Sequence, residues 1–298
     1  MITVRYNLTI MSPKITKKIT HIFFLMRLDK PIGILLLMWP MLWSLWLANN
    51  GNVSMKIFAV FMLGVVIMRS AGCVLNDFAD RKIDPYVKRT KERPIASGKV
   101  TEKEALVLFF VLIFLAFLLI LFLNRQTQVL AIIGACITAI YPFVKRILSA
   151  PQLILGFAFG WGVPMAFAAQ TGTVPLLGWL IFSIAIFWAL IYDTFYAMVD
   201  RDDDINLNVK STAILFGEKD LLFIGIFQLL MILQLFLMAK IANLGLWVYL
   251  SIVASIFLML YHQWISKDKD RESCFHAFKH NHYIGMIIFI GIFLNYNT

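Results

Sequence analysis

Long apolar runs separated by short polar segments make up most of the chain. From residue 30 to the C-terminus no polar gap is as long as a domain, and most runs approach the roughly 20 residues that a helix needs to cross a bilayer. The pattern predicts an all-α, polytopic membrane protein, a bundle of about nine transmembrane helices. The predicted spans are residues 30–49, 55–76, 104–123, 127–145, 151–170, 176–199, 220–240, 244–264 and 283–296.

Composition excludes an ordinary soluble protein. The 298 residues are 60% hydrophobic and 15% charged, whereas about 25% of residues are charged in a typical soluble domain. We predict a single membrane domain covering residues 1–298, in which residues 1–25 form a cytoplasmic lead-in. That lead-in contains lysines and no acid, and it lacks the apolar core and small-residue cleavage site of a secretory signal, so a mitochondrial presequence is the alternative.

The distribution of charge predicts which side of the membrane each loop occupies, because positively charged loops stay cytoplasmic. With the N-terminus inside, 23 of the 27 Lys and Arg residues lie in inside segments. All 17 acids, from Asp29 to Glu272, lie in or next to the same segments. We therefore expect an integral membrane protein, most simply of the bacterial inner membrane, with its polar chemistry and N-terminus on the cytoplasmic side.

The first acidic motif follows the second span, in the stretch from Asn76 to Pro94. If the helix continues until Pro85 stops it, Asn76, Asp80 and Asp84 lie within about 80° of one another on one polar stripe. Arg69 projects onto the same stripe from a position within the span. Ionisable groups in a span are costly unless they face a cavity and find partners, which favours a functional site over a solvated helix end.

The second acidic motif ends the sixth span. Asp193, Asp200 and Asp204 again share one helical stripe, at the inside end of a long apolar helix. Two carboxylate clusters facing one another provide the oxygen ligands that Mg²⁺ prefers when it also bridges to phosphate. The sequence therefore predicts a magnesium site built from both motifs.

Basic residues lie between and behind the acids, where free phosphate oxygens would need partners. The alternative interpretation is that they only set topology. Arg89 and Arg93 are the preferred phosphate ligands, because they lie four residues apart in a loop that ends at Pro94. The wider basic set is Arg81, Lys88, Arg89, Arg93, Lys145, Arg146 and Lys210.

These motifs resemble those of the UbiA superfamily of intramembrane prenyltransferases. The first is similar to N-D-x-x-D-x-x-x-D followed by R-T-x-x-R-P, and the second to D-x-x-Y-A-x-x-D-x-x-D-D, which includes Tyr196. The segments 27–33 and 141–170 resemble the branch that acts on 4-hydroxybenzoate. The resemblance covers nearly the whole chain, and its departures, Ser149 and Pro85, remove no candidate ligand.

The resemblance implies a nine-helix bundle that uses Mg²⁺ to transfer a polyprenyl group from a polyprenyl diphosphate to 4-hydroxybenzoate, in ubiquinone biosynthesis. The lipid bilayer would be its surroundings, and no nucleic acid is expected. Carried onto this sequence, the metal ligands are Asn76, Asp80, Asp84, Asp200 and Asp204. Asp80, Asp193 and Asp200 are the catalytic candidates, Asp193 by polarising the acceptor hydroxyl or collecting the ring proton. Tyr196 and the basic set would bind substrate, and Arg27 or Arg69 would hold the acceptor carboxylate.

Two other functions stay open on the sequence alone. A different branch of the superfamily would make menaquinone, haem O or prenylated homogentisate. A cation-coupled transporter would also place Asp and Arg in the membrane, but its acids should lie near the midplane rather than at one end.

Overall fold

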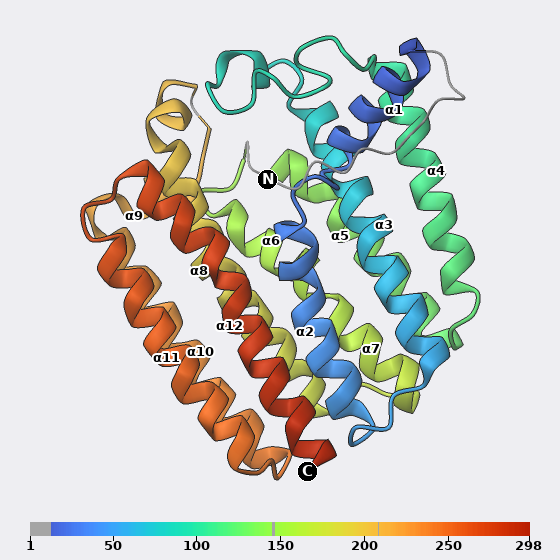
Figure 1. Cartoon of the computed structure of the whole chain (residues 1–298), viewed down its shortest axis with the longest axis vertical. Helices are drawn as coiled ribbons and strands as arrows, with labels where there is room; N and C mark the ends of the chain where they lie inside the picture. Colours follow the sequence, from blue (N-terminus) through green and yellow to red (C-terminus); the bar gives the residue numbers. More distant parts are fainter. Residues whose placement is uncertain (1–12, 145–146, 208) are drawn as a thin grey trace.

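The computed structural model describes residues 13–144, 147–207 and 209–298, and within these ranges it contains helices and no strand (Figure 1). The all-α prediction is confirmed. The helices are α1 (Pro13–Leu25), α2 (Ile32–Ala48), α3 (Met55–Ala79), α4 (Glu102–Ile120), α5 (Arg125–Val144), α6 (Pro151–Gly160), α7 (Gly162–Thr171), α8 (Leu176–Asn206), α9 (Thr212–Phe216), α10 (Asp220–Ile241), α11 (Leu246–Ile265) and α12 (Arg271–Asn297), with 3-10 turns at Asp84–Tyr86 and Gly217–Lys219.

Each predicted span is occupied by helix. Among the described residues, seven helical segments are long and apolar enough to cross a membrane, and α2 is a shorter apolar helix. The predicted span 151–170 is divided into α6 and α7 at Trp161, and the last span begins earlier than predicted, at Arg271. The chain is an integral membrane protein, while the count of nine crossings stays a prediction.

α8 is the central helix, and it packs against α2, α6, α10 and α12. Its long apolar stretch buries Trp188 and Phe195 in the main core. Trp188 stacks on Trp43 of α2 at a centroid distance of 5.6 Å. The indole of Trp43 donates to the Gly285 carbonyl of α12 at 2.9 Å, so three helices meet at one buried aromatic pair.

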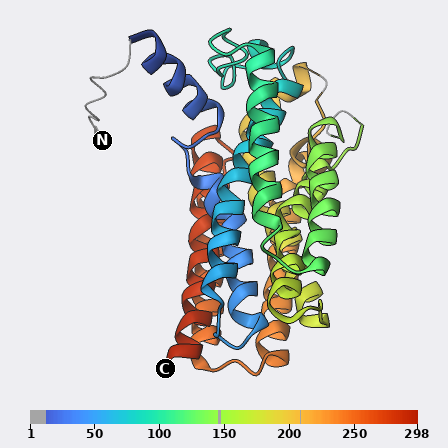
Figure 2. The ribbon, with the colours of Figure 1, turned by 90° about the vertical axis from the view of Figure 1, so that its right-hand side faces the viewer.

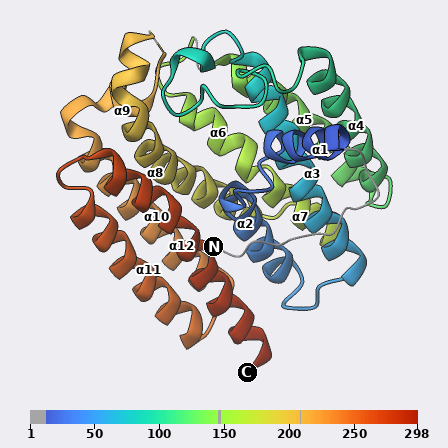
Figure 3. The same ribbon diagram turned by 45° about the horizontal axis from the view of Figure 1, so that its top comes forward.

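Both acidic motifs lie at the same end of the bundle, at the top of Figures 1 and 3. The second motif lies on α8, which continues as one helix to Asn206. The first does not: α3 ends at Ala79, and Asp80 is its C-cap residue. The prediction that this helix continues to Pro85 was wrong. The Asp80 carbonyl accepts the amide protons of Ile83 and Asp84, and this turn redirects the chain into a loop that covers the end of the bundle.

Candidate active site

A cavity of about 1250 Å³ opens among α2, α3, α5, α6 and α8 beneath this loop. Most of its lining is apolar, and its polar residues gather toward the end that carries the acidic motifs. Seven of the predicted site residues line it: Arg27, Arg69, Asn76, Arg89, Arg93, Asp193 and Tyr196. The sequence therefore identified much of the polar lining before the fold was known.

One side of the cavity reaches the outer surface of the bundle between α4 and α5. Phe117 and Leu121 line the cavity and are each 54% exposed, and Ile132 lines it at 67% exposed. Because these side chains face the lipid in a membrane-spanning bundle, the cavity is accessible from the bilayer. A long apolar chain could lie there without crossing water.

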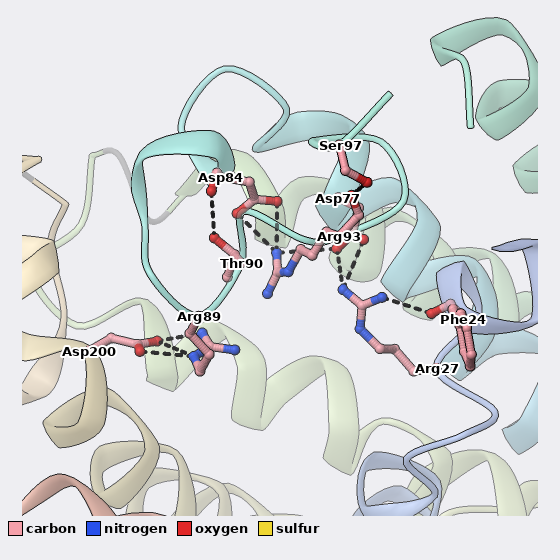
Figure 4. Close-up of polar contacts among 9 residues, drawn as sticks. All are labelled: Phe24, Arg27, Asp77, Asp84, Arg89, Thr90, Arg93, Ser97 and Asp200. Carbon is pink, nitrogen blue, oxygen red and sulfur yellow. Dashed lines mark hydrogen bonds and ion pairs between the residues drawn. The ribbon is translucent and has the colours of Figure 1, made fainter. Parts of the chain in front are cut away.

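The loop after α3 places arginines over the carboxylates at the mouth of the cavity (Figure 4). Arg89 binds Asp200 of α8 through both Nε and Nη2, and its guanidinium lies 4.7 Å from the centre of the Tyr196 ring. Arg93 binds Asp84 at 2.9 Å and Asp77 at 3.2 Å. The basic loop thus joins the two acidic motifs.

Asp77 is the most enclosed acid of this mouth. It is 1% exposed, and Arg27 binds both of its oxygens at 2.8 and 2.9 Å. Arg27 itself adopts a left-handed backbone conformation with φ of 58°, which a side chain other than glycine occupies at a cost unless surrounding contacts hold it. The donation of its Nη1 to the Phe24 carbonyl and the contact of its Nη2 with both Asp77 oxygens supply those contacts.

Asp84 is held from two directions. The Thr90 hydroxyl donates to its carbonyl at 2.9 Å, and Arg93 binds its carboxylate. Burial raises the pKa of Asp84 above its usual value, and the Arg93 guanidinium opposes that shift. Neighbouring Asp80 and Asp77 add to the rise, because like charges disfavour ionisation. A further cation would therefore stabilise this end of α3.

The donor chemistry of this mouth fits Mg²⁺, since it consists of carboxylates from both motifs and the Asn76 amide. Within the described part of the chain, however, no group of three or more His, Cys, Asp or Glu side chains is close enough to hold a metal ion. Arg89 and Arg93 engage Asp200 and Asp84 in this arrangement. Of the predicted metal ligands, Asn76 lines the cavity, whereas Asp80, Asp84, Asp200 and Asp204 do not line it in the described chain. The structure therefore does not bring the five together, and their metal role stays a prediction.

The inner part of the cavity contains Arg69 and Asp193, which are close enough to interact electrostatically. The Arg69 guanidinium lies 5.5 Å from the centre of the Phe159 ring, and its buried Nε has no hydrogen-bond partner. No ion pair to Arg69 occurs among residues 13–144, 147–207 and 209–298. Arg27, by contrast, is paired with Asp77. Arg69 therefore remains available to an anion inside the cavity.

Asp193 has a neighbour that the sequence analysis missed. Gln152, at the start of α6, contacts Asp193 through its side chain, and its Oε1 accepts the Thr212 amide proton at 3.0 Å. This bond directs the amide nitrogen of Gln152 away from Thr212 and leaves it to donate to Asp193. Asp77, Tyr141 and Tyr192 were also missed as cavity residues. Asp77 stood in the first motif, whereas the others gave no charged or periodic signal.

Several predicted basic ligands are engaged elsewhere. Arg81 pairs with Glu102 of α4 at 2.9 Å, and the Lys210 ammonium donates to the Ile147 carbonyl at 2.8 Å. Lys88 is exposed and does not line the cavity of the described chain. Lys145 and Arg146 lie outside the described residues. The structure therefore concentrates the phosphate candidates on Arg89 and Arg93.

Comparison with known proteins decides the family. Residues 37–288 match the model of the UbiA prenyltransferase family. The chain belongs to this family. Among curated UbiA proteins, the 4-hydroxybenzoate octaprenyltransferase of Providencia stuartii is 52% identical over 272 residues, covering 91% of this chain and 94% of that protein. The protein of the same name from Coxiella burnetii (strain CbuK_Q154) is 48% identical and covers 95% and 98%.

Solved UbiA structures have the same fold. A UbiA homolog from Aeropyrum pernix K1 superposes with a TM-score of 0.76 at 23% identity, covering 87% of this chain and 97% of that one. A UbiA homolog from Archaeoglobus fulgidus bound to GPP and Mg²⁺ gives 0.72 at 15% identity, covering 92% and 99%. These likenesses show that the fold is shared over most of the helical bundle.

Proposed function

We propose that the chain transfers a polyprenyl group from an all-trans-polyprenyl diphosphate to 4-hydroxybenzoate, in ubiquinone biosynthesis. The bond between the allylic carbon and the diphosphate oxygen breaks, and a carbon–carbon bond forms ortho to the acceptor hydroxyl. The ring then loses a proton and diphosphate is released. The curated relatives carry this activity in their names at about half identity over most of the chain.

The observation that carries the proposal is the order of groups along one cavity. A lipid-accessible apolar wall would hold the prenyl chain, the arginine-covered mouth would hold the diphosphate, and Arg69 with Asp193 would hold the acid. An Arg guanidinium suits a planar carboxylate, which it can bind through two hydrogen bonds. Arg69 rather than Arg27 is thus the proposed anchor of the acceptor carboxylate.

Mg²⁺, when bound, would neutralise the negative charge that develops on the departing diphosphate. The residues proposed to hold it are Asn76, Asp80, Asp84, Asp200 and Asp204. Arg89 and Arg93 would bind the phosphate oxygens, and Tyr196 would support Arg89 from beneath. Asp193 would accept a hydrogen bond from the acceptor hydroxyl or collect the ring proton, with Gln152 fixing its orientation.

We further propose that the chain lies in the bacterial inner membrane, with its N-terminus and the cavity mouth on the cytoplasmic side. The positive charge around the loop after α3 supports this orientation. Fusion of a reporter enzyme to the α2–α3 turn would test the orientation, because one crossing separates that turn from the N-terminus. Fusion to the C-terminus would test the number of crossings, because an even and an odd number place the C-terminus on opposite sides of the membrane.

The proposed reaction is tested with the purified chain in lipid, Mg²⁺ and a labelled polyprenyl diphosphate. Offering 4-hydroxybenzoate, homogentisate and 1,4-dihydroxy-2-naphthoate in parallel separates the branches of the family. We expect prenylated product from 4-hydroxybenzoate, lost on chelation of the metal. Product from another acceptor alone would assign the chain to a different branch, and no product from any acceptor would contradict the proposed reaction.

A further inference from the structure

The N-terminal helix α1 leaves an apolar edge uncovered. Ile19 is 45% exposed, Phe23 is 42% exposed and Phe24 is 40% exposed, although all three lie within six residues of one helix. Ile19 and Phe23 are four residues apart and share one face. Lys17, which is exposed, and Phe24 project at least about 100° away from that face. α1 is therefore amphipathic, and its apolar face is turned away from the protein.

Two contacts fix the height of α1 along the bundle. The Lys18 ammonium pairs with Glu104, in the first turn of α4, and also donates to the Lys99 carbonyl at 3.4 Å. At its other end, Leu25 is fully buried among side chains of α3 and α4. Figures 1 and 2 show α1 crossing beside these helices and leaning away from the bundle. The helix is thus held at the level where α4 begins.

That level is where the lipid-facing surface of α4 starts. Val107, Phe110 and Phe114 follow Glu104 at helical spacing and are 64%, 65% and 59% exposed. In a membrane-spanning bundle such a stripe contacts acyl chains. The pairing of Lys18 with Glu104 places α1 at the polar end of this stripe, at the level of the boundary between acyl chains and headgroups.

We propose that α1 is an interfacial helix that binds the inner surface of the membrane. Its Ile19 and Phe23 edge enters the acyl boundary, and Lys17 lies among anionic headgroups. A basic amphipathic helix with an aromatic residue, Phe23, on its apolar face has the composition that this position requires. The surplus of positive charge on this side of the chain complements an anionic lipid surface.

Membrane binding by α1 would also affect the cavity, because residues of α1 line its mouth. His21, Phe24 and Arg27 line its mouth, and Arg27 directly follows α1 and clasps Asp77. Membrane binding by α1 thus holds one wall of the mouth against the lipid from which an apolar substrate would enter. The inference does not depend on which acceptor is used, because it rests only on the placement of α1.

Hydrogen exchange of the full chain in lipid nanodiscs tests this placement. The amides of residues 16–25 are compared in phosphatidylcholine alone and in phosphatidylcholine mixed with phosphatidylglycerol. We expect exchange to be about fivefold slower in the anionic mixture, and Lys17→Gln to remove most of that difference. The double variant I19S/F23S should speed exchange by about tenfold or more in both lipids, because it removes the buried apolar edge.

Two controls make the result decisive. Leu222→Ser removes an apolar side chain that is 60% exposed on α10, and it should leave exchange in α1 unchanged. Unaltered exchange in α8 would show that each variant is folded. Equal exchange of α1 in both lipids and in the double variant would overturn the proposal. Protection that appears only in discs holding two chains would overturn it as well, since a second copy would then cover the face.

Discussion

The first acidic motif ends its helix, whereas the second lies on a helix that continues past it. In the first, the side chains of Asp77 and Asp84 are 2% and 6% exposed. In the second, the side chain of Asp200 is 13% exposed and that of Asp203 is 24% exposed. The carboxylates of the first motif are therefore enclosed by the loop that follows them, whereas Asp200 and Asp203 of the second motif are partly exposed.

The difference follows from where the counter-charges come from. The enclosed carboxylates are neutralised by Arg27, from the turn after α1, and by Arg93, from the loop after α3. Asp200 is instead paired with Arg89, which comes from the loop that follows the first motif. Buried carboxylates need such partners, because charge removed from water is otherwise strongly destabilising. The first motif thus has a structural as well as a proposed catalytic part, while the second depends on the loop.

The largest predicted effect is a loss of kcat, and we expect it to be similar in the two motifs despite their different burial. Asp80→Asn and Asp200→Asn should each lower kcat by about 10³-fold at saturating Mg²⁺, because both carboxylates are proposed to act on the departing diphosphate. Asp202→Asn is the matched control: its side chain is 76% exposed and pairs only at the surface with Arg271. Near-normal turnover by either of the first two variants would refute a site shared between the motifs.

The all-helical fold was largely predictable from the sequence because the lengths of the apolar runs determine the helices that can span a membrane. The end of α3 was not. The stripe of Asn76, Asp80 and Asp84 assumed an unbroken helix, but Arg93 and Thr90 from the following loop bind Asp84 and hold a turn instead. Helical periodicity contains no information about partners that come from another segment.

The candidate site shows the same limit. Charged residues such as Arg89, Arg93 and Asp193 were found because a charge near a span is conspicuous. Gln152 was not, since a neutral amide after Pro151 has no such signal, and its contact with Asp193 depends on how α6 meets α8. Choosing between Arg27 and Arg69 likewise required knowing that Asp77 engages one of them.

The free energy of unfolding should differ between variants of the two motifs, even though their loss of kcat is expected to be similar. Asp77→Ala leaves Arg27 without its buried partner and Arg93 with only Asp84, and we expect it to lower the free energy of unfolding by about 3 kcal/mol. Asp203→Ala removes a partly exposed contact with Arg271 that is 3.5 Å long, and should cost less than about 1 kcal/mol. Denaturant titration of both variants in detergent measures the two losses. Equal losses would mean that the first motif is no more structural than the second.

The two candidate anchors for the acceptor can be compared in the same way. Arg69→Lys should raise the KM for 4-hydroxybenzoate by about 30-fold, the equivalent of about 2 kcal/mol, because Lys cannot bind a carboxylate through a planar fork. Arg27→Lys should instead weaken the ion pair between residue 27 and Asp77 and raise the KM for the prenyl diphosphate. Steady-state kinetics with each substrate varied in turn distinguishes them. An unchanged acceptor KM in the Arg69 variant would place the carboxylate elsewhere in the cavity.

The smallest predicted effect tests how Arg69 is positioned. Gly33, in α2, lies against the Arg69 guanidinium so closely that a methyl group there would overlap it. Gly33→Ala should therefore displace Arg69 and raise the acceptor KM by about fivefold, although Ala stabilises a helix relative to Gly by about 1 kcal/mol. Gly64→Ala is the control, because Gly64 lines the same cavity and a methyl group there meets no atom within 4 Å. If both variants change the acceptor KM equally, crowding of Arg69 is not the cause. If only Gly33→Ala raises it, without loss of stability, the position of the Arg69 guanidinium against α2 determines how the acid is bound.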